Sequence, residues 1–161
     1  MWIKGLEIED FVNYKKPCMF ISMGTCDWKC CIEQGLDISI CQNSKLAKAQ
    51  EYNISLDKLY KYYITNPITE AIVIGGLEPF TRYQDIYDFV KFFRDNKCND
   101  DIIIYTGYMP EEFSSDLLSS ITNQGNIIIK FGRYIPNRPN IYDEVLGVTL
   151  ASDNQFAIEY R

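Results

Sequence analysis

The chain has 161 residues, with 16 basic and 22 acidic side chains and a net charge of −6. It contains six cysteines and no histidine, which excludes catalytic triads built on histidine and metal sites with histidine ligands. The acidic balance argues against nucleic acid as a partner, because binding to the phosphate backbone relies on an excess of lysine and arginine. The length suits one folded domain, and we expect residues 1–161 to form it.

No apolar run approaches the roughly 18 residues that a membrane span needs. The first ten residues carry acidic side chains where a secretion signal would have an apolar core. We therefore expect a cytoplasmic protein with no membrane partner. Because cysteines in the reducing cytoplasm seldom form disulfides, the six thiols are candidates for metal binding or redox chemistry.

Strand-like and helix-like segments alternate along the chain. The apolar run Cys18–Ser22 predicts a first strand that ends at a glycine. Ser55 is a candidate N-cap for a helix that stops before Pro67, and Ala71–Ile74 reads as a strand buried on both faces. The later expected elements are, in chain order, a helix containing Ile86 and Phe93, a solvated turn at Asp100 and Asp101, a strand at Ile102–Tyr105, a helix beginning at Pro110, a strand at Asn126–Lys130, and short strands near 146–150 and 156–160.

This alternation predicts an α/β fold of parallel strands joined by right-handed helical crossovers. Ligands of such sheets bind at the carboxyl ends of the strands. Four glycine-bearing segments fall at these ends and are therefore expected along one edge: Met23-Gly24, Gly75–Pro79, Thr106–Tyr108 and Phe131-Gly132.

The loop at residues 25–43 holds four cysteines, at positions 26, 30, 31 and 41. Three or four thiols in so short a loop can close around one metal centre, either zinc or an iron–sulfur cluster. Structural zinc usually takes four ligands in two close pairs, and Cys26 with Cys30 lacks a matching second pair unless Cys18 or the distant Cys98 joins. Three thiolates with one iron left open suit a cluster better. Cys18 and Cys98 lie outside the loop and are expected to be buried, non-ligating residues.

Two segments together resemble the radical S-adenosylmethionine (SAM) enzymes: the Cys26-x3-Cys30 pair after one strand, and Gly75–Pro79 after the next. More specifically, the chain is similar along most of its length to the activating proteins of anaerobic ribonucleoside-triphosphate reductase. The other motifs that carry this resemblance are Cys41-Gln42-Asn43, Ile104–Tyr108 and Ala151–Gln155.

The chain departs from this family's pattern at several places, one of them Ile40, where the family usually has an aromatic residue before the third cysteine. The family pattern is Cys-x3-Cys-x2-Cys, and Glu33 occupies the position of the third cysteine. We assign the third ligand to Cys41, with Cys31 as the alternative. The glycine motif is one residue longer than the family's Gly-Gly-Glu-Pro, and Lys130 stands at a strand end where the family typically has an acid before a glycine.

The resemblance implies a partial (βα) barrel with an open side, since a full barrel needs about 250 residues. It implies that Cys26, Cys30 and Cys41 hold a [4Fe–4S] cluster whose fourth iron binds SAM. An electron from a flavodoxin-type donor would then cleave SAM to a 5′-deoxyadenosyl radical, which generates a glycyl radical on anaerobic ribonucleotide reductase. The residues expected at the SAM site are Gly75, Gly76, Glu78, Thr106 and Tyr108.

Two other functions remain open from the sequence. One is a radical SAM enzyme that acts on a small molecule, similar to 7-carboxy-7-deazaguanine synthase, because unusual cysteine spacing also occurs in that group. The other is a non-enzymatic domain in which cysteines bind a metal for stability.

Overall fold

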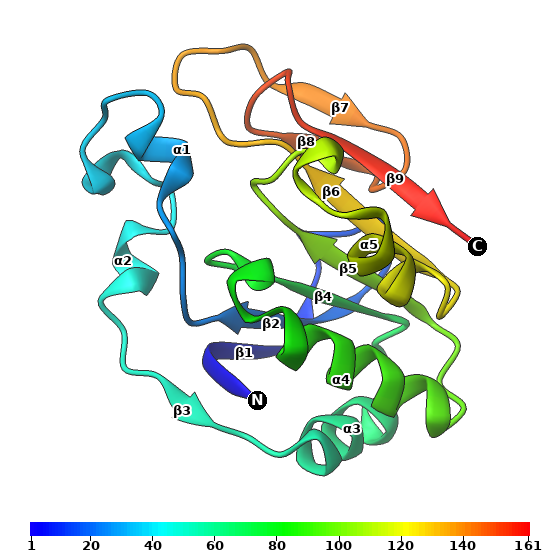
Figure 1. The fold of residues 1–161 in the computed structure, drawn as a ribbon. Coiled ribbons are helices and arrows are strands. Elements are labelled where there is room, and N and C mark those ends of the chain that lie inside the picture. Colours follow the sequence, from blue (N-terminus) through cyan, green and yellow to red (C-terminus); the bar gives the residue numbers. More distant parts are fainter.

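The computed structural model describes all residues from 1 to 161 and contains a seven-stranded sheet in the order β3-β1-β2-β4-β5-β6-β9 (Figure 1). A separate two-stranded hairpin, β7-β8, lies beside it. The strands are β1 (Trp2–Asp10), β2 (Cys18–Met23), β3 (Tyr52–Asn53), β4 (Ala71–Gly76), β5 (Asp101–Tyr105), β6 (Ile127–Phe131), β7 (Ile141–Asp143), β8 (Val148–Leu150) and β9 (Phe156–Tyr160).

The centre of the sheet consists of four parallel strands, β2, β4, β5 and β6, which are neighbours in that order. Their core residues are apolar on both faces, as the sequence predicts for strands covered on both sides. Ile72 and Ile74 face one core and Val73 faces the other, because successive side chains of a strand point in opposite directions. The predicted strands at 18–22, 71–74, 102–105 and 126–130 are thus confirmed to within a residue or two.

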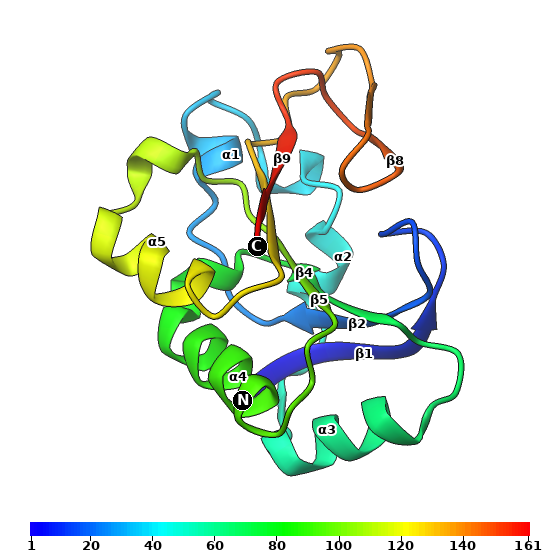
Figure 2. The same cartoon turned by 90° about the vertical axis from the view of Figure 1, so that its right-hand side faces the viewer.

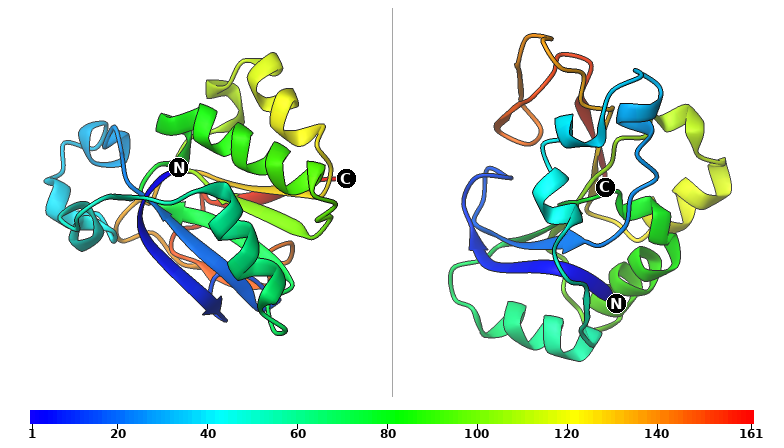
Figure 3. Two further views of the ribbon diagram at one scale, coloured as in Figure 1. Left: turned by 90° about the horizontal axis from the view of Figure 1, so that it is seen from below. Right: turned by 90° about the vertical axis from the view of Figure 1, so that its left-hand side faces the viewer.

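The three longer helices, α3 (Leu56–Thr65), α4 (Tyr83–Asp95) and α5 (Ser115–Thr122), pack on one face of the sheet (Figures 2 and 3). Ser55 caps α3, since its hydroxyl accepts a hydrogen bond from the Lys58 backbone N–H. The opposite face is covered by the β7-β8 region, through Leu146 and Leu150. The helices therefore leave the second face to the C-terminal third of the chain.

The sheet also contains three antiparallel strands. β1 pairs antiparallel with β2, β3 with β1, and β9 with β6. Strand β1 was not expected, because its alternation of apolar and charged residues is broken by a glycine. β3 pairs only with Trp2 and Ile3, so most of β1 has no neighbour on that side, and a strand that is half exposed needs only part of its side chains to be apolar.

Two local predictions are wrong. Pro110 begins a short 3₁₀ turn, η3 (Pro110–Glu112), and not the α-helix itself, which starts at Ser115 after the N-cap Ser114. Asp101 is buried in β5, although a solvated turn was predicted there. Its carboxylate accepts hydrogen bonds from the Tyr14 hydroxyl at 2.9 Å and from the Lys16 ammonium at 3.0 Å, so long-range partners compensate its burial.

The segment with the clustered cysteines folds into short turns: α1 (Lys29–Ile32), η1 (Ile38–Ile40) and α2 (Ser44–Ala47). Figures 1 and 2 place α1 and the β7-β8 region at the same end of the molecule. None of the helices is long and apolar enough to cross a membrane.

Candidate functional site

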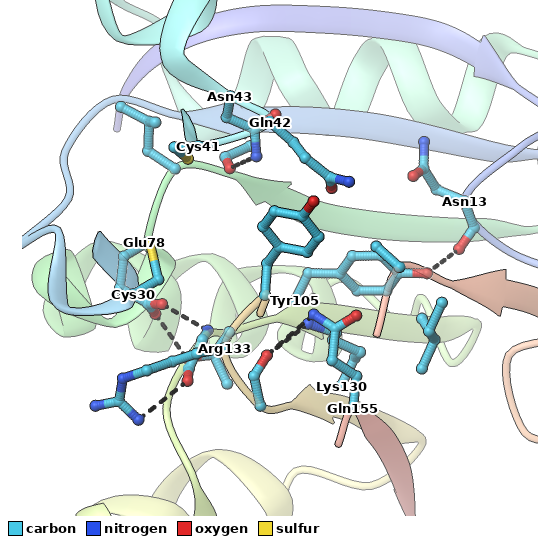
Figure 4. Close-up of a pocket in the computed structure, with 18 of the residues that line it drawn as sticks. Asn13, Cys30, Cys41, Gln42, Asn43, Glu78, Tyr105, Lys130, Arg133 and Gln155 are labelled. Carbon is cyan, nitrogen blue, oxygen red and sulfur yellow. Dashed lines mark hydrogen bonds between the residues drawn. The ribbon is translucent and has the colours of Figure 1, made fainter. Parts of the chain in front are cut away.

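A cavity of about 330 Å³ lies at the carboxyl ends of the parallel strands (Figure 4). Such an edge is where parallel sheets bind ligands, since the strand ends and the following loops converge there. The segments that line the cavity are Val12-Asn13, the cysteine loop with Cys41–Asn43, Gly76–Glu78 at the end of β4, Tyr105–Gly107 at the end of β5, Lys130 with Gly132–Tyr134 at the end of β6, and Val148–Ala151 with Gln155.

Three of the four loop cysteines line this cavity: Cys26, Cys30 and Cys41. Cys31 is buried and does not line it, although its sulfur lies 3.8 Å from that of Cys30. The two are adjacent on α1, where successive side chains point about 100° apart. Cys18 is buried at the start of β2, whereas the loop follows the end of that strand, and Cys18 does not line the cavity. The structure thus brings together the three cysteines that were assigned as ligands.

The cysteine loop is held against the sheet at its far end. The Asn43 side chain donates a hydrogen bond to the Gly76 carbonyl at the end of β4. Within the loop, the Asp37 carboxylate accepts from the Ser39 backbone N–H at 2.8 Å and caps η1 just before Cys41. These contacts hold Cys41 at the cavity near Cys30. They depend on Asn43 lying only two residues after Cys41 in the sequence.

The cavity thiols differ in how readily they ionise. The neighbouring Cys30 side chain lowers the pKa of Cys41, whereas burial raises the pKa of Cys26 to about 11. Thiolates, not thiols, bind metals. No group of three cysteine, aspartate or glutamate side chains is gathered closely enough to hold a single ion. In an iron–sulfur cluster each thiolate binds a different iron, so the ligands need not converge on one point.

Glu78 is a buried carboxylate that joins the ends of β4 and β5. It is 6% exposed and accepts hydrogen bonds from the Thr106 hydroxyl at 2.7 Å and from the Gly107 N–H at 2.8 Å. It also caps the turn that follows, accepting from the Phe80 N–H. Burial raises its pKa, and these donors oppose that effect. Glu78 therefore holds two strand ends in register at the cavity.

The other predicted SAM-site residues divide between the cavity and the region behind it. Gly76 and Thr106 line the cavity, whereas Gly75 and Tyr108 do not. The Tyr108 hydroxyl instead donates to Asp27 at 2.7 Å, which connects the turn after β5 to the cysteine loop. Gly76 has φ of +82°, and a Cβ there would lie 3.0 Å from the Cα of Ser22 on β2. Only glycine fits this turn without displacing backbone.

Arg133 links the cysteine loop to the turn after β5. Its guanidinium contacts both carboxylate oxygens of Glu112 at 2.6 Å and pairs with Glu33 at 2.9 Å. Glu33 occupies the position of the third motif cysteine. Its ion pair with Arg133 therefore ties the cysteine loop to the segment after β6. This network lowers the pKa of Glu112 to about 2, chiefly through the hydrogen bonds from Arg133.

Several cavity residues had no predicted role. Lys130 is the clearest case, because it is 7% exposed within the apolar strand β6. Its signal in the sequence is a single charged residue at the end of an otherwise apolar buried strand. Tyr105 and Gln155 also line the cavity. Gln155 belongs to the Ala151–Gln155 motif, which carries the family resemblance but predicts no role for this side chain.

Three cysteines at the edge of an α/β sheet are an arrangement that suits a metal site with thiolate ligands. A family model described as "4Fe-4S single cluster domain" matches residues 18–154. The chain belongs to this family of iron–sulfur proteins. A comparison with curated proteins found no relative.

Proposed function

We propose that the chain is a radical SAM enzyme that generates a glycyl radical on anaerobic ribonucleotide reductase. The observation that supports this most is the meeting of Cys26, Cys30 and Cys41 with the strand ends at Gly76 and Thr106 around one cavity. The donor set contains only thiolates, which are the usual ligands of a [4Fe–4S] cluster. The four parallel strands in consecutive order are compatible with a partial (βα) barrel.

In this proposal Cys26, Cys30 and Cys41 hold the cluster. Bound there, it would supply the electron that cleaves SAM to methionine and a 5′-deoxyadenosyl radical. The chain's own residues bind and orient SAM. Gly76 brings the end of β4 to the cavity in a turn that only glycine fits, and Glu78 keeps Thr106 in place at the next strand end through a 2.7 Å hydrogen bond.

The rim of the cavity suits a protein partner. Val12 lines the cavity and is 74% exposed, and its neighbour Phe11 is 63% exposed. Exposed apolar side chains of this size beside a cavity are typical of surfaces that contact another protein. A glycine-bearing loop of the reductase would enter here, and a flavodoxin-type protein would deliver the electron.

Anaerobic reconstitution tests the cluster assignment. We expect a brown protein with about four irons and four sulfides per chain. Cys41→Ala should lose most of this iron, and Cys31→Ala should keep it. Cys31→Ala is the matched control, because it removes a neighbouring thiol that does not line the cavity. A protein that binds only zinc, or a cluster that depends on Cys31 and not on Cys41, would contradict the proposal.

The reaction is tested separately. The reduced protein should form 5′-deoxyadenosine from SAM, and the reductase incubated with it should show a glycyl radical in electron paramagnetic resonance. A reductase with its radical glycine replaced by alanine is the control. If SAM is cleaved but no radical appears on the reductase, the proposed partner is wrong while the radical SAM chemistry stands.

A second candidate function is a radical SAM enzyme that acts on a small molecule. The observation that favours it is the buried polar end of the cavity, where Lys130 and Gln155 lie beneath the β7-β8 region. A cavity with an enclosed polar end can hold a whole small substrate. This function predicts that a small metabolite, added without any partner protein, increases 5′-deoxyadenosine formation.

A further inference from the structure

Lys130 places a buried ammonium in the cavity without an ionic partner. The side chain is 7% exposed, and its Nζ donates to the Gly132 carbonyl at 2.9 Å. The acid that acts on it electrostatically, Glu78, is already engaged by the Thr106 hydroxyl and the Gly107 N–H. An unpaired charge in a buried site is costly, so an anion that entered would be attracted strongly.

Gln155 adds a second donor beside this ammonium. Its Nε2 donates to the same Gly132 carbonyl at 3.1 Å, which places the two nitrogens next to each other. An ammonium has three N–H donors and an amide has two. Two donors of Lys130 and one of Gln155 therefore have no protein acceptor. Such a pair of donors matches the two oxygens of a carboxylate.

No other unpaired cation lines the cavity, so an anion would bind at Lys130. Arg133 is the other cation that lines it, and its guanidinium is taken by Glu112 and Glu33. Burial lowers the pKa of Lys130 to about 8, so the side chain is still mostly protonated at pH 7. Lys130 is thus the free positive charge of the cavity.

Apolar side chains form part of the same cavity. Phe20, Val148 and Leu150 line the cavity together with the ring of Tyr105, whose centre lies 6.0 Å from the Lys130 Nζ. A ligand here would place an apolar body against these walls and its charged group at Lys130. Figure 4 shows Lys130 and Gln155 on the side of the cavity away from Cys30 and Cys41.

We propose that the substrate entering this cavity carries a carboxylate, which binds to Lys130 with Gln155 beside it. The inference rests on the proposed function for the reaction at this site, although the binding itself needs no SAM. SAM's own carboxylate is a different group, because in the proposed function it lies at the cluster. The carboxylate belongs either to a free small acid or to an acidic side chain next to the partner's glycine.

The test is a ligand-observed NMR titration of the reconstituted protein without SAM. The probes are benzoate, its uncharged analogue benzamide, and the blocked dipeptides acetyl-Gly-Glu-amide and acetyl-Gly-Gln-amide. The variants are Lys130→Met and Lys130→Gln, two neutral side chains of different length. Lys91→Met is the control, because it removes one positive charge from an exposed position on α4.

We expect benzoate or the Glu dipeptide to bind and the uncharged analogues not to bind. Both Lys130 variants should weaken this binding at least roughly tenfold, as for a lost charge-assisted hydrogen bond, and Lys91→Met should not change it. The probe that binds better identifies the source of the carboxylate.

Binding of neither carboxylate, or equal binding by the Lys130 variants, overturns the proposal. A separate SAM titration of the same variants completes the test. If loss of Lys130 weakens SAM binding tenfold or more, the anion at Lys130 is SAM's own carboxylate and the proposal is also wrong. Failure of the proposed function would appear differently, as a wild-type protein that binds the carboxylate but never cleaves SAM.

Discussion

Replacing Lys130 with methionine should make the protein more stable. Burial lowers the pKa of Lys130 from 10.5 to about 8. Since one pH unit corresponds to about 1.4 kcal/mol, the folded state disfavours the charged side chain by about 3 kcal/mol at neutral pH. The substitution also removes the hydrogen bond to Gly132, which contributes about 1 kcal/mol. Methionine has a similar length, so the net gain is about 2 kcal/mol.

The gain should depend on pH in a defined direction. The folded pKa lies below the unfolded one, so the unfolded chain binds more protons between about pH 8 and 10.5. Stability of the wild type therefore rises with pH across this window. The advantage of Lys130→Met is full below pH 8, shrinks above it and is lost before pH 10.5, because the neutral lysine keeps its hydrogen bond to Gly132. A residue that reduces stability in this way is typical of a functional site.

Thermal unfolding of the anaerobic, reconstituted proteins measures the effect. For a chain of this size, about 2 kcal/mol corresponds to a Tm increase of roughly 4 to 8 °C. Lys91→Met is the matched control, since Lys91 is half exposed and pairs only with Asp95, and it should change Tm by no more than about 2 °C. A Lys130→Met protein that melts below the wild type at pH 7 would refute the reasoning.

Three further changes have defined outcomes. Gly76→Ala should lower the free energy of unfolding by at least about 2 kcal/mol in chemical denaturation, because its φ is +82° and the added Cβ meets Ser22 backbone; an unchanged midpoint would contradict this. Ser55→Ala should cost about 1 kcal/mol through loss of the α3 cap, and Ser55→Thr, which keeps an acceptor, should cost less. Arg133→Met should raise the pKa of Glu112 from about 2 toward its ordinary value. Glu112 stabilises the fold above its unfolded pKa and loses this effect as pH falls, so the variant should show a weaker acid dependence of stability, and NMR titration of Glu112 checks it.

The sequence alone determined the central elements of the fold. The runs around Val73 and Ile103 are apolar at every position, and a strand buried on both faces is the structure that such short runs favour. Ser55 and Pro67 bounded α3 by local chemistry, since a cap and a helix breaker act within one turn. The clustered cysteines indicated an iron–sulfur protein for the same reason, because their chemistry and spacing are local properties.

The tertiary structure decided which groups face the cavity. Cys30 lines the cavity and the adjacent Cys31 does not, because their side chains leave α1 in different directions. Asp101 looked like a turn residue, yet Tyr14 and Lys16, far away in sequence, allow its burial.

Lys130 shows the same limit most clearly. Its charge is visible in the sequence, but its lack of an ionic partner is not. Glu78 accepts its hydrogen bonds from Thr106 and Gly107, after β5, and Lys130 donates only to the Gly132 carbonyl. Burial and pairing arise when segments distant in the chain meet. Residue type and spacing therefore determined the elements and the metal chemistry of this protein, and only the fold determined which side chains are free to bind a ligand.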